Sequence, residues 1–193
     1  MSELRTFLGA LARKPAGVGA IAPSSRALAS TMVALAHIED GDHVVELGAG
    51  TGPMTRALRD AHPHHDVLVL EPDVGLAAKC RENVPGVEVA EAYAQDLPRL
   101  IAERGWPHVD RVVSSLPFAA WPAPLQKEVF DAILTVLKPG GRLVTFTYAH
   151  SPYLPAGRRA RALLERTFDR VHLSPVIWGN VPPAFVYVCD RAP

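Results

Sequence analysis

The segment from Val44 to Gly52, which reads Val-Val-Glu-Leu-Gly-Ala-Gly-Thr-Gly, constrains the fold more than any other part of the chain. Apolar residues followed by three alternating glycines predict a buried strand that runs into a tight turn. Pro53 follows, and proline is favoured at the first position of a helix because its missing N–H would be unbonded there. A strand, a glycine turn and a helix start form a cradle for a nucleotide, since a ligand can come close to such a backbone.

Apolar strands and helices alternate along the chain after this turn. Strands are expected at 44–47, 67–70, 87–90, 109–115 and 142–148, and helices at 53–61, 74–83, 97–103 and about 125–137. A helix at 157–167 and two close strands at 171–178 and 184–188 follow. This order predicts an α/β fold, with a mostly parallel sheet, helices on both faces and an antiparallel edge strand.

The residues before the glycine turn form a separate helical extension. Leu4, Phe7, Leu8 and Leu11 recur at helical spacing, with basic residues elsewhere around the same helix, and therefore predict an amphipathic helix at 2–14. Ser24 or Ser25 can cap a second helix at 24–38. The sequence thus divides into an extension at 1–41 and a catalytic domain at 42–193.

Composition excludes several classes of protein. The 20 basic and 20 acidic residues balance, which gives no electrostatic reason to expect nucleic-acid binding. The two cysteines, Cys80 and Cys189, cannot build a secreted disulfide framework and are expected to be buried thiols in a reducing compartment. No apolar run approaches the ~20 residues that span a bilayer, and no signal peptide is visible. We expect a cytoplasmic protein, a monomer, that associates peripherally with the inner face of the cell membrane.

The spacing of the glycines distinguishes between nucleotide-binding families. Dinucleotide sites use Gly-x-Gly-x-x-Gly, whereas this chain has Gly-x-Gly-x-Gly with Pro53 in the place of the third glycine, and Glu46 stands two residues before the first. The pattern resembles motif I of the class I S-adenosylmethionine-dependent methyltransferases. That resemblance implies a Rossmann-like sheet of seven strands, with S-adenosyl-L-methionine as cofactor and S-adenosyl-L-homocysteine as product.

Further segments follow the other strands in the order that this family has. Glu71 comes at the end of the second strand, where a carboxylate can bind both ribose hydroxyls, and the segment at Asp96 resembles the one whose acid binds the adenine amino group. Leu137-Lys-Pro-Gly-Gly141 matches the family's turn before the fifth strand. The predicted cofactor-binding residues are Ser25, Glu46, Gly48, Ala49, Gly50, Gly52, Glu71, Pro72, Asp96, Leu97, Ser114 and Ser115.

Each of these residues also has a simpler explanation. Glu71 could be a solvated acid, and Asp96 could only cap the helix that follows it. The histidines at 62, 64 and 65 lack the ligand spacing of zinc sites and are interpreted as a solvated loop, so no metal is expected. A binding protein that keeps the fold without the chemistry is a further alternative.

The segment after the fourth strand bears on the methyl acceptor. Enzymes that methylate a planar base nitrogen often carry Asn-Pro-Pro-Tyr or Asn-Leu-Pro-Tyr there, whereas this chain has Ser115-Leu-Pro-Phe118. The ribosomal RNA adenine dimethyltransferases are similar over this stretch, but Ser115 departs from their asparagine. RNA, or a small soluble amine, is therefore the alternative acceptor.

The N-terminal extension points to another acceptor. Val18-Gly-Ala-Ile-Ala-Pro-Ser-Ser25, Ser114-Ser-Leu-Pro117, Phe146-Thr-Tyr148 and Asn180-Val-Pro-Pro183 resemble the soluble bacterial phospholipid N-methyltransferases. The resemblance implies stepwise methylation of phosphatidylethanolamine towards phosphatidylcholine, with a phospholipid substrate and an anionic membrane surface as partners. The 2–14 helix would lie in the membrane interface, although such a helix can also pack on the protein's own sheet.

Methyl transfer to an amine needs positioning and the removal of a proton. Tyr148 and the residues around Ser114 are the candidates for catalysis, with His150 as another candidate base. Aromatic faces attract the cationic nitrogen of methylated products. Arg158, Arg159, Arg161 and Arg166 form either a second basic contact or a solvated helix face. The predicted substrate or membrane residues are Leu4, Phe7, Leu8, Leu11, Phe118, Trp121, Tyr153, Trp178 and Asn180.

Overall fold

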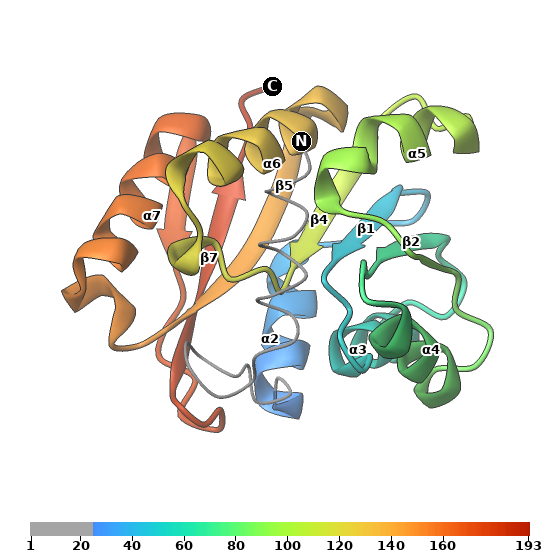
Figure 1. Ribbon diagram of the computed structural model, residues 1–193, viewed down its shortest axis with the longest axis horizontal. Helices are drawn as coiled ribbons and strands as arrows, with labels where there is room; N and C mark the ends of the chain where they lie inside the picture. Colours follow the sequence, from blue (N-terminus) through green and yellow to red (C-terminus); the bar gives the residue numbers. More distant parts are fainter. Residues whose placement is uncertain (1–24) are drawn as a thin grey trace.

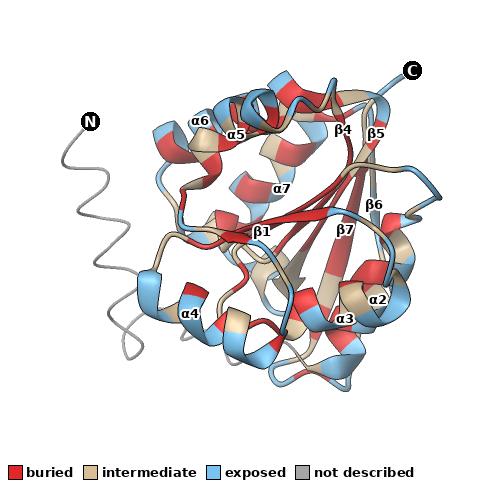
Figure 2. Cartoon of the chain, turned by 90° about the vertical axis from the view of Figure 1, so that its right-hand side faces the viewer, coloured by how far each residue is buried: buried red, intermediate tan, exposed pale blue. Residues whose placement is uncertain are grey.

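The computed structural model describes residues 25–193, which form a seven-stranded sheet between two layers of helices (Figures 1 and 2). The predicted 2–14 helix, with Leu4, Phe7, Leu8 and Leu11, lies outside the described residues. The strands are β1 (Val44–Leu47), β2 (Val67–Leu70), β3 (Val89–Ala90), β4 (Val109–Ser114), β5 (Leu137–Tyr148), β6 (Arg170–Leu173) and β7 (Ala184–Asp190).

Six α-helices cover the faces of this sheet within residues 25–193. They are α2 (Arg26–Ala36), α3 (Pro53–Ala61), α4 (Val74–Asn83), α5 (Leu97–Arg104), α6 (Ala123–Val136) and α7 (Pro155–Thr167). Short 3-10 turns, η1 (Ala94–Asp96), η2 (Phe118–Ala120) and η3 (Ser151–Tyr153), precede α5, α6 and α7. The predicted alternation is confirmed, and most boundaries agree within a few residues.

The order of the strands is β3-β2-β1-β4-β5-β7-β6. Strands β1 to β5 are parallel, while β7 runs antiparallel to both β5 and β6, so the sheet ends in the expected antiparallel pairing with β7 inserted one place from the edge. The chain builds outward from β1 to β3 and then returns to β4 beside β1. In such sheets the ligand crevice lies beyond the carboxyl ends of the strands, where the order reverses. Here that point falls between β1 and β4.

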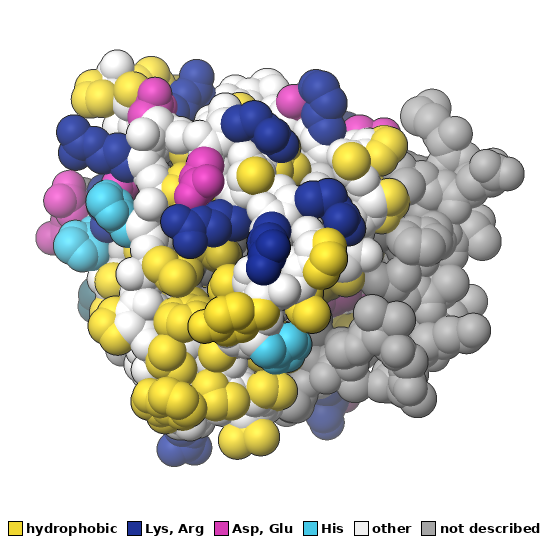
Figure 3. Space-filling view, turned by 90° about the vertical axis from the view of Figure 1, so that its left-hand side faces the viewer, with side chains coloured by type: hydrophobic (Ala, Val, Ile, Leu, Met, Phe, Trp, Pro, Cys, Tyr) yellow, Lys and Arg dark blue, Asp and Glu magenta, His cyan; other side chains and the backbone are white. Residues whose placement is uncertain are grey.

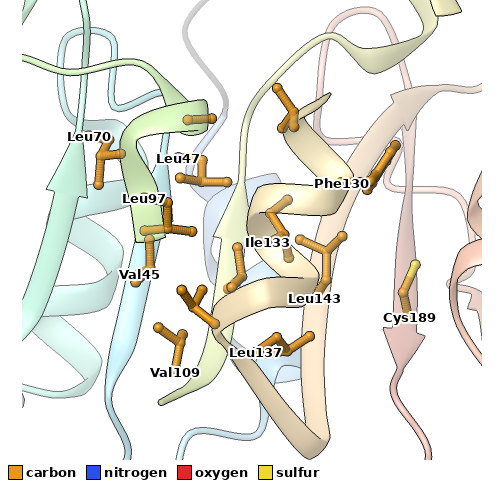
Figure 4. Close-up of a cluster of buried hydrophobic side chains, with 14 of the residues drawn as sticks. Val45, Leu47, Leu70, Leu97, Val109, Phe130, Ile133, Leu137, Leu143 and Cys189 are labelled. Carbon is orange, nitrogen blue, oxygen red and sulfur yellow. The ribbon is translucent and has the colours of Figure 1, made fainter. Parts of the chain in front are cut away.

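Two apolar layers hold the sheet. Alternate residues of each strand face α5, α6 and α7 on one side, where Val45, Leu47 and Leu143 pack with Leu97 and Ile133 (Figure 4). The other residues face α2, α3 and α4. Because both faces are covered, the central strands are apolar at nearly every position, as parallel sheets require.

The start of α2 and the start of β5 were both predicted from the residues that precede them. Ser25 is the N-cap of α2, and its Oγ accepts a hydrogen bond from Leu28 N at 3.1 Å, as the sequence predicted for Ser24 or Ser25. The Lys138-Pro-Gly-Gly turn was expected to precede the fifth strand. It instead belongs to β5, whose pairing with β4 shifts register between Val109 and Arg111, because a bulge accommodates the extra residues. Cys80 and Cys189 are buried free thiols, as expected.

Candidate functional site

The glycine turn after β1 lies between the ends of β2 and β4. The N–H of Gly48 donates to Leu70 O at 2.9 Å, and Leu47 O accepts from the N–H of Ser115 at 2.9 Å. Gly48 has φ +81°, a conformation that favours glycine, and a Cβ placed there would also come within 2.9 Å of the Leu116 side chain in the loop after β4. The turn therefore sits at the reversal point of the sheet.

The other two glycines of the turn serve different purposes. A Cβ added at Gly50 (φ +55°) would meet no atom within 4 Å. A Cβ added at Gly52 (φ +93°) would come within 3.0 Å of Cys80 Sγ on α4. Both angles lie in the region that favours glycine. Gly52 thus packs the turn against α4, and Gly50 leaves the outer side of the turn free for a ligand.

Glu71 holds the turn from the end of β2. One carboxylate oxygen accepts from the N–H of Gly50 at 2.8 Å, and the other accepts from the N–H of Asp73 at 3.0 Å. Glu71 is 6% exposed, and burial raises its pKa while the two N–H groups oppose that rise. The alternative of a solvated acid is therefore excluded for Glu71.

Glu46 is buried in β1 without a partner of its own. It is 0% exposed, and neither carboxylate oxygen has a hydrogen bond of normal geometry to a described residue. Burial raises the pKa of Glu46 from 4.5 to about 8; nearby Thr55 offsets part of this rise, and the Glu71 charge adds to it. A cation placed beside a buried carboxyl with such a raised pKa stabilises the ionised form of that carboxyl.

These residues fit the cofactor that the sequence predicts. S-adenosylmethionine carries an ammonium and a sulfonium, and Glu46, next to the glycine turn, can supply the negative charge that such groups need, because a bound cation favours the ionised form of this carboxyl. The free side of Gly50 lets a cofactor come close to the backbone of the turn, and Glu71 has lone pairs left to accept hydrogen bonds from ribose hydroxyls. The cofactor itself supplies an electrophilic methyl group.

Asp96 and Leu97 lie at the junction of η1 and α5. The Asp96 carboxylate accepts from the N–H of Tyr93 at 3.1 Å and makes no cap bond to α5, so it shapes the turn before the helix. Leu97 is completely buried, and its side chain packs in the core (Figure 4). Because α5 directs the Leu97 side chain against the sheet, the predicted contact of Leu97 with the cofactor would have to come from its backbone.

The loop after β4 brings together the predicted acceptor residues. Ser114 is fully buried and its Oγ accepts from the N–H of Leu116 at 3.3 Å, so this hydroxyl shapes the loop. Phe118 is 6% exposed; its ring packs edge-on against Trp121 and at a tilt of 34° against Phe130 in the core. Phe118 is therefore a core residue rather than an acceptor contact. Ser115 is only half-buried beside the glycine turn.

Tyr148 stands at the carboxyl end of β5. Its ring stacks on His150, with centroids 5.9 Å apart, and meets Phe146 edge-on. Burial raises the pKa of Tyr148, so its phenol stays protonated at neutral pH. It can accept or donate a hydrogen bond there, but it is a poor general base.

The remaining predicted residues lie in the loops beside Tyr148. Tyr153 and Trp178 are 77% and 76% exposed. Asn180 is buried instead, with its Oδ1 accepting from Ser25 N at 3.0 Å and its Nδ2 donating to Pro182 O at 2.8 Å. The prediction that Asn180 contacts substrate or membrane is corrected, since both ends of its amide are bonded within the chain. Ser25 likewise serves as a helix cap and an anchor for this loop.

Two contacts at the site were missed by the sequence reasoning. Asn83, at the end of α4, donates to Thr51 O at 2.8 Å, and the Thr55 hydroxyl lies 3.4 Å from Cys80 Sγ. No sequence signal marks Asn83 or Cys80, because their role depends on how α4 packs. Of these residues, only Thr55 could have been predicted from the sequence, because it stands two positions after Pro53 in the helix that follows the glycine turn.

A second polar cluster lies at the amino end of the sheet, away from the glycine turn. His43 and His108 approach Asp110 at 3.6 and 3.5 Å, an arrangement that could hold a metal ion. Lys138 Nζ already bonds to the Asp110 carboxylate. Burial opposes the lowered pKa of Asp110, but Lys138 and the N–H of His43 outweigh it. Lys138 supplies the positive charge that this carboxylate needs.

Known proteins resemble this chain over the same features. A family model described as a methyltransferase domain matches residues 44–141. The chain is 35% identical to the ornithine lipid N-methyltransferase of Singulisphaera acidiphila, over 98% of this chain and 96% of that protein. It is 29% identical to ribosomal RNA small subunit methyltransferase B of Salmonella typhi, over 68% of this chain but only 35% of that protein.

Solved structures share the fold at lower identity. The precorrin-6y C5,15-methyltransferase of Geobacter metallireducens superposes with a TM-score of 0.65 and 17% identity, over 86% of this chain and 88% of that one. The matched family model covers the glycine turn, Glu71, Asp96 and the loop after β4. With the unpaired Glu46 and the free side of Gly50, these findings show that the chain belongs to the class I S-adenosylmethionine-dependent methyltransferases.

Proposed function

We propose that this protein transfers methyl groups from S-adenosylmethionine to the primary amine of a membrane lipid headgroup. The observation that carries the proposal is the similarity to a lipid N-methyltransferase over 98% of the chain, well beyond the methyltransferase domain at 44–141. The sequence motifs favour phosphatidylethanolamine as acceptor, with stepwise transfer towards phosphatidylcholine. The relative at 35% identity is named for ornithine lipid. Both lipids present a primary amine near an anionic group.

The reaction requires an amine lone pair in line with the methyl–sulfur bond. The nitrogen–methyl bond forms as the sulfur–methyl bond breaks, S-adenosylhomocysteine leaves, and the nitrogen loses a proton. Catalysis is then mainly positioning. Ser115, beside the glycine turn, and Tyr148, at the end of β5, flank the place where the acceptor would enter.

Tyr148 would act as a hydrogen-bond acceptor for the amine. Its raised pKa keeps the phenol neutral, so its oxygen can accept a hydrogen bond from an N–H of the ammonium. Its ring can also face a methylated, cationic nitrogen. The proton would pass to water, with His150 stacked on the same ring as a second acceptor. Ser114 would act through the shape of its loop.

The proposed setting is the cytoplasmic face of the membrane, with a monomer docking on anionic lipid. In residues 25–193 no helix is long and apolar enough to cross a bilayer. Leu4, Phe7, Leu8 and Leu11 would insert at the interface from the amphipathic 2–14 helix, while nearby basic residues would meet lipid phosphates.

A direct test mixes the purified full chain with labelled S-adenosylmethionine and vesicles that contain phosphatidylethanolamine, ornithine lipid or neither. Label in extracted amino lipid supports the proposal, and the number of methyl groups identifies the extent of the series. Glu71→Ala should lose most of this label at low cofactor concentration, whereas Glu82→Ala, an exposed acid on α4, should retain it. No label in either lipid, with cofactor binding intact, would contradict the proposal, and label in RNA or in soluble amines would replace it.

A further inference from the structure

The exposed large apolar side chains of residues 25–193 gather at one end of the molecule. Four of the six, namely Tyr153, Leu154, Trp178 and Val181, lie in the segments between β5 and α7 or between β6 and β7, and a fifth, Leu173, is the last residue of β6. Only Val74 lies elsewhere. We call the five residues the apolar tip. Large exposed apolar side chains that cluster in this way mark an interaction surface.

The segments that carry the apolar tip are tied together by backbone bonds. Ala149 N, just after β5, donates to Pro183 O at 2.7 Å, and Ile177 pairs with Ala184. Tyr153 N and Leu154 N close the η3 turn on His150 O and Ser151 O. Buried Asn180 fastens the loop before β7 to Ser25. The exposed side chains therefore stand on a fixed backbone, and Ser25, the first described residue, is bonded to the same loop.

Basic side chains border the apolar tip. Between residues 153 and 173 the chain has five arginines and two acids, although its overall charge is balanced. Arg161 pairs with Glu165, while Arg158, Arg159 and Arg166 are exposed and make no ion pair with any described residue. Figure 3 shows hydrophobic side chains over the lower part of this face, with a row of Lys and Arg side chains above them.

We propose that the apolar tip and the arginines beside it dock on an anionic lipid bilayer. The aromatic and aliphatic side chains would enter the headgroup region, where Trp and Tyr are favoured, and Arg158 and Arg159 would bind lipid phosphates. The five residues and the arginines of this surface do not include any residue of the predicted 2–14 helix. The proposal rests on the proposed lipid substrate. It adds how the enzyme would reach that lipid, because docking in this orientation turns the end of β5, with Tyr148, towards the headgroups.

Charge favours a bilayer over a second copy of this chain. A twofold dimer through the same surface would place each set of unpaired arginines near its symmetry mate, and like charges repel. An anionic bilayer supplies both the apolar layer and the opposite charge. The amphiphilic composition of the surface thus matches the lipid partner.

The test uses the full chain and vesicles of phosphatidylcholine with phosphatidylglycerol, which contain no amine acceptor for methyl transfer. Removing both charges in Arg158→Gln/Arg159→Gln should weaken vesicle binding by about 25-fold, since each basic residue contributes about fivefold. Leu154→Ser/Val181→Ser should weaken it by about tenfold or more. Arg99→Gln, on α5, and Val74→Ser, the exposed valine outside the tip, are the matched controls and should bind as the wild type does.

Tryptophan fluorescence provides a second readout. Trp178 is 76% exposed, whereas Trp106 and Trp121 pack against the core. Brominated lipids should quench the wild type, and Trp178→Phe should abolish that quenching while the protein still binds. Quenching that persists in Trp178→Phe would overturn the inference, and so would wild-type vesicle affinity in both double variants. Concentration-dependent dimers without vesicles, lost in the same variants, would assign the surface to self-association instead.

Activity on detergent-solubilised lipid separates this inference from the proposed function. The arginine and Leu154/Val181 variants should methylate amino lipid in detergent micelles at the wild-type rate and lose activity only on vesicles. A wild type that docks through the apolar tip but methylates no lipid in detergent would contradict the proposed function alone. Methylation of vesicle lipid by variants that no longer bind vesicles would contradict the docking surface.

Discussion

The carboxylate of Glu71 accepts a hydrogen bond from the backbone N–H of Gly50 at 2.8 Å, and so joins the end of β2 to the glycine turn that follows β1. The residues stand 21 positions apart in the sequence. This bond holds the turn in the shape that leaves the outer side of Gly50 free. The acid predicted to bind ribose therefore also organises the backbone of the cofactor site before the cofactor arrives.

Removing this carboxylate should weaken cofactor binding. We expect Glu71→Ala to lose about 1–3 kcal/mol of binding free energy, because a charge-assisted bond to the turn and the bonds to ribose both disappear. Calorimetric titration of S-adenosylmethionine into each protein measures the loss. Glu82→Ala should keep the wild-type affinity, and an unchanged affinity in Glu71→Ala would remove Glu71 from the site.

Glu46 should make stability depend on pH. Its folded pKa of about 8 lies above its ordinary value of 4.5, so the folded chain holds a proton that the unfolded chain releases earlier. The free energy of unfolding should then fall as pH rises from about 5 to 8, by at most about 1.4 kcal/mol per pH unit from this group, and level off above 8. Glu46→Gln, which cannot ionise, should not show this fall. Urea unfolding at pH 5, 7 and 9 without cofactor measures it.

The same variant separates stability from binding. A bound cation favours the ionised carboxyl, so wild-type affinity for S-adenosylmethionine should rise with pH up to about 8. Glu46→Gln should bind more weakly and without that rise. If the affinities of the two proteins changed with pH in the same way, Glu46 would not interact with a charge on the cofactor.

Gly50 and Gly105 form a matched pair for testing the open side of the turn. Both have positive φ, +55° and +70°, and a Cβ at either position meets no atom within 4 Å. Alanine should therefore cost each site a similar backbone strain, of about 1–2 kcal/mol in folding. Only Gly50→Ala should lower cofactor affinity, by about tenfold or more, because its methyl group enters the ligand's space. Equal affinities in the two variants would place the cofactor elsewhere.

Asn180 should contribute to stability through both ends of its amide. Asn180→Ala loses the bonds to Ser25 N and Pro182 O, and we expect the free energy of unfolding to fall by about 1–3 kcal/mol. Asn180→Asp keeps an acceptor for Ser25 N, but it buries a carboxylate and sets one of its oxygens against Pro182 O, so its loss should be at least as large. Hydrogen exchange should accelerate at the Ser25 amide in the alanine variant only. Unchanged exchange there would show that the contact does not hold the start of α2.

The local elements followed from the residues themselves. Proline at the start of α3, Ser25 before α2 and the apolar strands at 44–47 and 67–70 were predicted correctly because each depends on neighbouring residues. The positions of Glu46, Glu71 and the glycines relative to the predicted strands also indicated that they lie at the candidate site. Contacts between distant segments gave no such signal, as Asn83 on Thr51 and Asn180 on Ser25 illustrate.

The sequence by itself determined the order of strands and helices and the glycine turn, because backbone preferences and apolar spacing act over a few residues. It also determined the cofactor, through the resemblance that these residues carry. Only the tertiary structure decided which predicted side chains remain free to contact a ligand or a surface. Leu97 and Phe118 pack inward and Asn180 is bonded within the chain, whereas Tyr153 and Trp178 stay exposed. Burial and hydrogen bonding depend on what the folded chain places around each side chain, and residue type alone cannot specify that environment.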